Sequence, residues 1–171
     1  IFSFQAFPIL AVSVGLTLGL GVGTLLSKEP TLQPFVFSHA AHTDEKVAEC
    51  SLCHQGVKTQ AQAGLPDLTI CTTCHATVPG TNPSEADSKL WELAHAGEAP
   101  PWNRLFRVPS HVYFSHRRHV GFAQLEWEEC HGDMKSRTKI PKYALKTMMM
   151  RQCIDCHEEE QVTVDCTTCH R

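Results

Sequence analysis

The sequence predicts one N-terminal transmembrane helix followed by a small, mostly irregular and α-helical domain. Two observations support this fold class. Residues 1–27 contain no charged side chain and the run from Ala6 to Leu26 is almost wholly apolar, whereas about 20 apolar residues are enough to cross the hydrocarbon layer of a bilayer. The rest of the chain shows little sustained hydrophobic periodicity, so it has too few aliphatic residues in register for an ordinary core.

The apolar N-terminal segment is longer than the stretch of about 7–15 residues that is usual in a signal peptide. It is also still present in the chain, which favours a retained anchor over a cleaved leader. Gly15, Gly19 and Gly23 follow each other at a spacing of four, and such a glycine face lets another helix approach closely in lipid. We expect a partner helix there, from a second copy or from a larger complex. The predicted domains are an anchor (1–27), a linker (28–34) and a water-facing domain (35–171).

Within the water-facing domain, the residues from Glu85 to Ala96 are predicted to form a helix with Ser84 as its N-cap. The stretch from Gly97 to Pro109 contains three prolines and is predicted to be an irregular loop.

The cysteine and histidine content separates this chain from ordinary soluble domains. Nine cysteines cannot all close into disulfides because the number is odd, and eleven histidines accompany them. This joint enrichment indicates a metal or haem protein. The net charge of −3 is too small to imply a nucleic-acid partner.

Four complete Cys-x-x-Cys-His motifs carry the chemistry. Two thiols three positions apart can add to the two vinyl groups of one haem, which leaves the next imidazole to bind the iron. Paired cysteines that hold zinc would not explain why histidine always follows the second cysteine. The motifs begin at Cys50, Cys71, Cys153 and Cys166, with second cysteines Cys53, Cys74, Cys156 and Cys169 and histidines His54, His75, His157 and His170.

A fifth motif lacks its first cysteine, because Trp127 stands where the other motifs have a thiol. Cys130 could still hold a haem through a single thioether, with His131 on the iron. The alternative is that this motif carries no haem. Its position directly after a repeated histidine element favours occupancy, so we expect five haem c groups.

That repeated element divides the domain into two halves. Val36-Phe37-Ser38-His39-Ala40-Ala41-His42 is echoed by Tyr113-Phe114-Ser115-His116-Arg117-Arg118-His119, and Cys-His motifs follow each copy. The first half (35–107) carries two motifs and the second half (108–171) carries three.

Each low-spin haem needs a second axial ligand, from histidine or methionine. His39 and His42 are three residues apart and so lie on one side of a helical turn, where they can serve two neighbouring haems. His116 and His119 repeat this spacing. One haem then still needs a distal ligand. We favour Met150 or Met149 because they directly precede Cys153, with His95 and His111 as alternatives.

The Phe-x-His-x-x-His element ahead of successive Cys-x-x-Cys-His motifs resembles the class III cytochromes, the c3 and c7 group. The resemblance implies two c7-like units packed around haem. It also implies four axial pairs, in which His39 pairs with His54, His42 with His75, His116 with His131, and His119 with His157.

Two such units behind one transmembrane helix are similar to the pentahaem subunit of alternative complex III, a bacterial quinol-oxidising complex. This resemblance implies an electron carrier with no substrate chemistry of its own, within an assembly of other membrane and extracytoplasmic subunits. The implied donor is an iron–sulfur protein, and the implied acceptor is a monohaem cytochrome, a copper protein or a haem–copper oxidase.

Two other function classes stay open. A quinol dehydrogenase of the NapC/NrfH type would oxidise quinol at its own haem, and a multihaem redox enzyme would need an iron with one open face. Because haem is attached covalently outside the cytoplasm, we expect the domain on the periplasmic side of a bacterial inner membrane.

Overall fold

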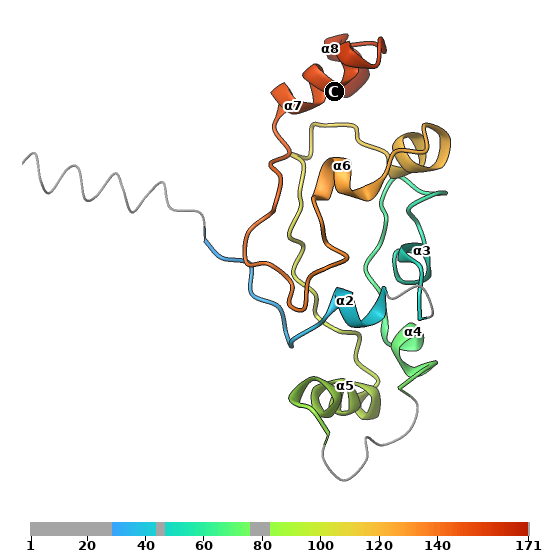
Figure 1. Ribbon diagram of the computed structural model, residues 1–171, viewed down its shortest axis with the longest axis vertical. Helices are drawn as coiled ribbons and strands as arrows, with labels where there is room; N and C mark the ends of the chain where they lie inside the picture. The colour runs from blue at the N-terminus through green and yellow to red at the C-terminus, as the bar shows by residue number, and fades with distance from the viewer. Residues whose placement is uncertain (1–28, 44–46, 76–82, 171) are drawn as a thin grey trace, which may run out of the picture. The chain divides into compact units, whose positions relative to one another are not determined.

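The computed structural model describes residues 29–43, 47–75 and 83–170. These parts of the chain contain short helices joined by long irregular segments (Figure 1), and the β-structure among them is a single isolated bridge between Val112 and His170. The helices are α2 (His39–His42), α3 (Cys50–Cys53), α4 (Leu68–Thr72), α5 (Glu85–Ala96), the π-helix η1 (Arg117–Phe122), α6 (Trp127–His131), α7 (Met150–Glu159) and α8 (Cys166–Cys169). The mostly irregular and helical fold that the sequence predicts is therefore confirmed for these residues.

The chain divides into two compact units between Pro30 and Thr31, a point inside the predicted linker. The predicted transmembrane helix, residues 1–27, lies outside the described residues. Among the helices that the structure describes, none has both the length and the apolar character needed to cross a bilayer.

The chain enters the second unit along a loop that holds it tightly. Asn103 donates from its side-chain amide to the backbone oxygen of Leu32 at 2.7 Å, and the side chain of Gln33 bonds with both backbone groups of Asn103. The Phe35 ring lies 4.8 Å from that of Trp102. Leu32 and Gln33 of the predicted linker are thus fixed to the irregular loop 97–109.

Helix α5 has the limits that the sequence predicts. The Ser84 hydroxyl accepts a hydrogen bond from the Asp87 amide, and the Asp87 carboxylate accepts one from the Ser84 amide, which completes a capping box. The helix ends at Gly97, which has φ of 67° and adopts the left-handed conformation that glycine tolerates best. Local signals alone thus determine where this helix begins and ends.

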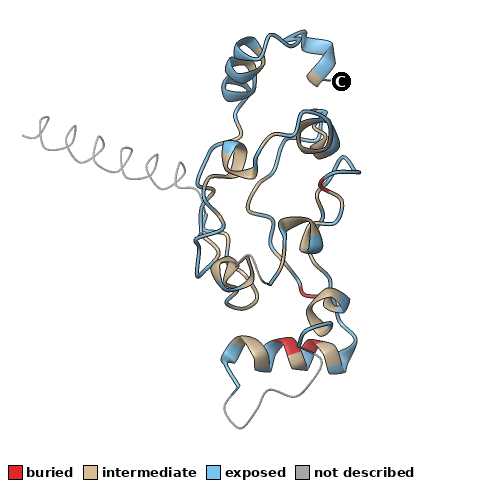
Figure 2. Cartoon of the chain, turned by 45° about the vertical axis from the view of Figure 1, so that its right-hand side comes forward, coloured by how far each residue is buried: buried red, intermediate tan, exposed pale blue. Residues whose placement is uncertain are grey.

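The hydrophobic core formed by side chains is very small. Among the described residues, the buried hydrophobic side chains are Val57, Leu90 and Leu93, and Figure 2 shows most helices as exposed or only half-buried. Large apolar side chains such as Phe122 and Tyr143 are at least half exposed. As the sequence predicts, side chains alone do not provide an ordinary core, so something else must cover these surfaces.

The two halves of the second unit meet at the loop that follows α3. The amides of His116 and Arg117 donate to the backbone oxygens of Ala61 and Gln60 at 3.0 and 2.9 Å. A Cβ added at Gly121 would lie 2.4 Å from the Lys58 oxygen, so only glycine allows this approach. The start of η1 is therefore built directly onto the first half.

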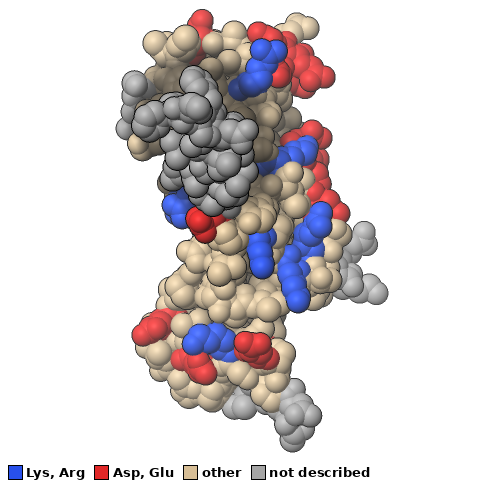
Figure 3. Space-filling view, turned by 90° about the vertical axis from the view of Figure 1, so that its left-hand side faces the viewer, with Lys and Arg blue, Asp and Glu red and all other residues tan. Residues whose placement is uncertain are grey.

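A basic segment from Lys135 to Lys146 lies beside the first half as well. The Ala40 amide of α2 donates to the Arg137 oxygen at 2.9 Å, and Lys135 forms a 3.1 Å ion pair with Glu128 of α6. Basic and acidic side chains lie close together on the face shown in Figure 3. This segment thus connects α2, which carries two candidate ligands, to α6.

Candidate functional site

The five Cys-His motifs, numbered sites 1 to 5 in chain order, lie on the short helices α3, α4, α6, α7 and α8. A helical turn brings side chains three positions apart to the same face, so the two cysteines of each complete motif are neighbours. In sites 1, 2 and 5 the histidine amide donates to the oxygen of the first cysteine, at 2.9, 2.9 and 2.8 Å. All nine cysteines are free thiols, as covalent attachment of haem requires.

Five candidate ligands are oriented by their second ring nitrogen. The Nδ1 atoms of five histidines lie 2.8–3.0 Å from backbone carbonyl oxygens. Because a carbonyl oxygen only accepts, each Nδ1 must carry the proton, which leaves a lone pair on Nε2 for a metal. The pairs are His42 with Ser38, His54 with Gly64, His116 with Ala61, His119 with Ser115 and His157 with Thr163.

The structure brings candidate ligands together in pairs. Ring centroids are 6.1 Å apart for His42 and His75, 6.3 Å for His116 and His131, and 6.1 Å for His119 and His157. A metal–imidazole bond is about 2.0–2.1 Å long, and the ring centre lies roughly 1.1 Å further out, so two rings across one ion are separated by roughly 6.3 Å. These three spacings match two imidazoles on opposite faces of one iron.

The repeated histidine element has the same local geometry in both copies. Phe37 stacks on His42 with centroids 4.5 Å and planes 23° apart, and Phe114 stacks on His119 at 4.6 Å and 23°. In each copy a serine oxygen accepts from Nδ1 of the second histidine. The sequence repeat therefore corresponds to a structural repeat that presents two imidazoles in a defined orientation.

Burial keeps the imidazoles of His39 and His131 neutral. It is the main cause that lowers the pKa of both His39 and His131 to about 4, with His54 contributing in both cases. Their Nδ1 atoms are buried and have no hydrogen-bond partner. A buried neutral imidazole beside another histidine is well suited to bind a metal, and these contacts place His39 near His54.

His111 lies 55 residues before Cys166, the first residue of the last motif, but next to that motif in space. Its ring stacks on that of His170 with centroids 5.5 Å and planes 21° apart. The amide of Tyr113 donates to the Cys169 oxygen at 2.7 Å, which holds this strand-like segment against α8.

The other candidates for the fifth distal position have different surroundings. Met150 and Met149 are 64% and 62% exposed at the start of α7. His95 lies on α5 with its ring 3.8 Å from that of Trp91. Neither arrangement resembles the paired rings, so the geometry favours His111 for this position.

Site 3 is an apolar pocket despite its missing cysteine. Its lining is mostly apolar and includes Phe114, His116, Val120, Leu125, Cys130 and His131. The Trp127 ring lies 5.3 Å from that of His54, in site 1, and 6.1 Å from that of His131. The pocket thus combines one thiol, two facing imidazoles and apolar walls, which are the groups that a singly attached haem requires.

Contacts between motifs give the sites a spatial order. Burial raises the pKa of the Cys53 thiol, and the neighbouring thiols of Cys50 and Cys74 raise it further. In the same way, burial and then the thiol of Cys156 raise the pKa of Cys130. Burial and then the thiol of Cys169 raise the pKa of Cys153.

Site 1 therefore adjoins site 2, site 3 adjoins site 4, and site 4 adjoins site 5, while Trp127 joins site 1 to site 3. The resulting order is 2–1–3–4–5, and the helices that carry the motifs follow one another in this order in Figure 1. The donor set and this close succession fit c-type haem at each position.

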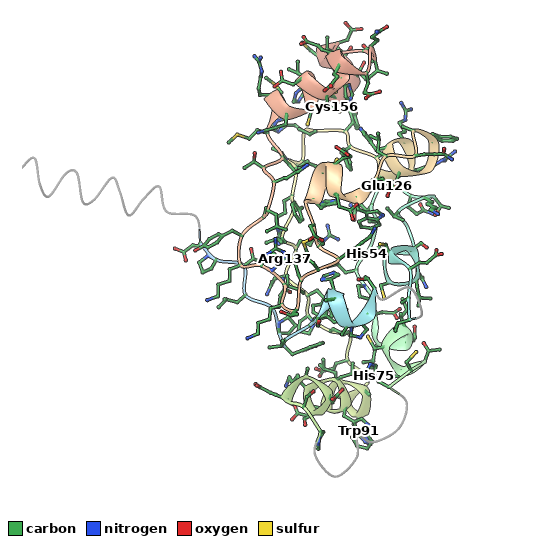
Figure 4. The ribbon with its side chains drawn as sticks, viewed as in Figure 1. His54, His75, Trp91, Glu126, Arg137 and Cys156 are labelled. Carbon is green, nitrogen blue, oxygen red and sulfur yellow. The ribbon has the colours of Figure 1, made fainter. Side chains whose placement is uncertain are left out.

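One residue near the sites was not singled out by the sequence. Asp87 Oδ1 lies 3.6 Å from Nδ1 of His75, and Figure 4 shows His75 beside α5. The sequence signal at Asp87 was its position three residues after Ser84. That spacing is typical of a helix cap and does not indicate a contact with a ligand histidine.

Two family models and a curated protein match this chain. Residues 112–171 match the model for cytochrome c7 and related cytochrome c, and residues 24–100 match the model for the class III cytochrome c family. The chain is 32% identical over 162 residues to the multiheme cytochrome c subunit of menaquinone reductase from Nitratidesulfovibrio vulgaris (strain Hildenborough), covering 81% of this chain and 77% of that protein.

Proposed function

Because the chain belongs to the class III and c7-related multihaem c-type cytochromes, which bind haem covalently and transfer electrons, we propose that it is the five-haem relay subunit of a membrane-bound, quinone-linked oxidoreductase. The bound haem irons supply one-electron chemistry. The observation that carries this proposal is the pairing of a second imidazole with the histidines of the Cys-His motifs.

In this proposal ten histidines would hold the five haem irons, two for each iron. The proximal set is His54, His75, His131, His157 and His170, and the distal set is His39, His42, His116, His119 and His111, in the same site order. His111 thus takes the place that the sequence assigned first to Met150. With two imidazoles at each site there is no open position for a substrate, which is why we propose a carrier rather than an enzyme.

The nine cysteines anchor the five groups. Sites 1, 2, 4 and 5 offer two thiols each, and site 3 offers Cys130 alone. Carbonyl partners fix the ring orientation of the ligands, and the apolar side chains that the protein leaves exposed become the walls of the sites. The small core formed by Val57, Leu90 and Leu93 is consistent with this role.

The partners follow from the relative and from the predicted anchor. The similar protein from Nitratidesulfovibrio vulgaris is named as a subunit of a menaquinone reductase. We place this chain in an assembly of the same kind, with residues 1–27 in the bacterial inner membrane and the haem domain on the periplasmic side. An iron–sulfur subunit is the proposed direct partner, and a monohaem cytochrome, a copper protein or a haem–copper oxidase is the proposed acceptor if the complex oxidises quinol as alternative complex III does.

The first experiment is an intact-mass measurement of the full chain. Five haem adducts are expected, whereas four would remove site 3 from the proposal. The reduced protein should not bind carbon monoxide, because both faces of each iron are closed. Carbon monoxide binding by the wild-type protein would support a multihaem enzyme instead.

The ligand assignment at site 5 is tested by a pair of variants. His111→Ala should open one iron, so that one haem of five binds carbon monoxide. Met150→Ala should leave the reduced protein unable to bind carbon monoxide, like the wild type. The reverse result would assign the position to Met150. Reduction of the isolated subunit by a menaquinol analogue, without other subunits, would favour a quinol dehydrogenase of the NapC/NrfH type.

A further inference from the structure

The group that faces Nδ1 of His75 differs in kind from the carbonyl partners of five other candidate ligands. Five ligand histidines have Nδ1 within 2.8–3.0 Å of a neutral backbone carbonyl. Nδ1 of His75 instead faces the carboxylate of Asp87, with 3.6 Å between Nδ1 and Oδ1. This distance exceeds that of a hydrogen bond, so Asp87 acts on the imidazole mainly through its charge.

Two hydrogen bonds hold Asp87 in place through its other oxygen. The Ser84 hydroxyl donates to Oδ2 at 2.6 Å, and the Ser84 amide donates to the same atom at 3.3 Å. These bonds lower the pKa of Asp87, with the hydroxyl contributing most. The residue is therefore an ionised carboxylate at neutral pH, with Oδ1 directed at His75.

The helix that carries Asp87 is itself fixed. Two of the few buried hydrophobic side chains among the described residues, Leu90 and Leu93, belong to α5. Helix α5 packs against α4, which contains Cys71 of site 2. A charge on a helix that is anchored in this way keeps its position relative to the ligand.

We infer that Asp87 is a positioning residue that lowers the reduction potential of the haem at site 2 relative to the other four. A carboxylate near Nδ1 makes the imidazole a stronger electron donor, which stabilises the oxidised iron. Neutral carbonyl partners have a weaker effect of the same sign. Since site 2 is at one end of the order 2–1–3–4–5, the low-potential end of the array lies at α4 and α5.

This inference rests on the proposed function, since it assumes haem at site 2. The experiment is a redox titration of the full-length, haem-loaded protein, followed by optical and electron paramagnetic resonance spectra. Asp87→Asn removes the charge but keeps an oxygen that can accept from Ser84. We expect one haem to shift to higher potential and the ferric signal of that haem to change, while the other four stay in place.

The chain offers a matched control. Asp67 caps α4 through Oδ1, which accepts from the amides of Thr69 and Ile70 at 3.0 and 3.3 Å. Asp67→Asn removes the same charge four residues before Cys71, but no contact between Asp67 and His75 is present in the structure. We expect a smaller shift in this variant, and Asp87→Glu should restore most of the wild-type potential.

The outcomes separate this inference from the proposed function. If the titration of Asp87→Asn overlays that of Asp67→Asn, the inference is overturned. If a shifted haem exists but its ferric signal is unchanged in Asp87→Asn, Asp87 does not act through the ligand and the inference also fails. A mass that shows no haem at site 2 refutes the proposed function at that site, whatever the potentials are.

Discussion

Replacement of Gly121 by alanine should weaken the junction between the two halves of the haem domain. The added Cβ would lie 2.4 Å from the Lys58 oxygen and 3.2 Å from the Lys58 carbonyl carbon. A normal contact needs roughly 1 Å more, and both obstructing atoms belong to the backbone. Overpacking of this kind costs about 1–3 kcal/mol.

For a chain of this size, each kcal/mol corresponds to roughly 2–4 °C in melting temperature, so Gly121→Ala should melt about 2–12 °C below the wild type. The assay is the loss of helical circular dichroism of the haem-loaded protein at a fixed heating rate. Gly64→Ala is the control, because Gly64 has φ of 82° but no atom within 4 Å of an added Cβ. Because position 121 has no such positive φ, Gly64→Ala reports backbone strain without a clash, whereas Gly121→Ala reports a clash without that strain.

The reasoning is refuted if Gly121→Ala melts less than about 2 °C below the wild type. It is supported if the expected loss of stability comes with a changed electron paramagnetic resonance signal at site 3. Such a change is expected because His116, whose Nδ1 bonds to Ala61 at 3.0 Å, lies on the same junction.

Three further changes have defined outcomes. Ser84→Ala removes the capping box of α5 and should cost about 1 kcal/mol, seen as faster hydrogen exchange of the α5 amides; unchanged exchange would contradict the role of the cap. Phe114→Leu removes a ring stacked 4.6 Å from His119, a contact worth about 0.5–1.5 kcal/mol, and should alter the ferric signal of site 4 but not that of site 2. Trp127→Cys restores a complete motif, so one haem in five should gain a second thioether and the α-band of its pyridine complex should move to shorter wavelength; an unmoved band would mean that position 127 cannot reach the haem.

Local signals were sufficient for the helix that is defined locally. Ser84, Asp87 and Gly97 are within 14 positions of each other in the sequence and determine both ends of α5. The irregular loop from Gly97 to Pro109 is likewise confirmed. The repeated histidine element could be recognised because the spacing of two imidazoles on a turn is itself a local property.

What depends on tertiary contacts could not be predicted in the same way. The sequence favoured Met150 or Met149 for the fifth distal position because they precede Cys153, with His95 and His111 as alternatives, and nearness along the chain could not decide among them; the ligand proposed from the spatial contacts is His111. His111 is 59 residues before His170 and meets it only because the backbone at Val112 and Tyr113 pairs with the last motif. The junction at Gly121 arises in the same manner, because its neighbour Lys58 lies 63 residues earlier in the chain. Asp87 is only 12 residues after His75, but its carboxylate faces the imidazole because α5 packs against α4.

A linear array offers no detour around a defect. The contacts described above join the motifs in the order 2–1–3–4–5, and the central motif is the one in which Trp127 replaces a cysteine. In the five-haem relay proposed above, loss of an end haem would only shorten the path of the electrons, whereas loss of the haem at site 3 would leave two unconnected pairs. The haem with a single thioether would then be the one that every electron crossing the subunit has to pass, and its retention would depend on the side chains that enclose it.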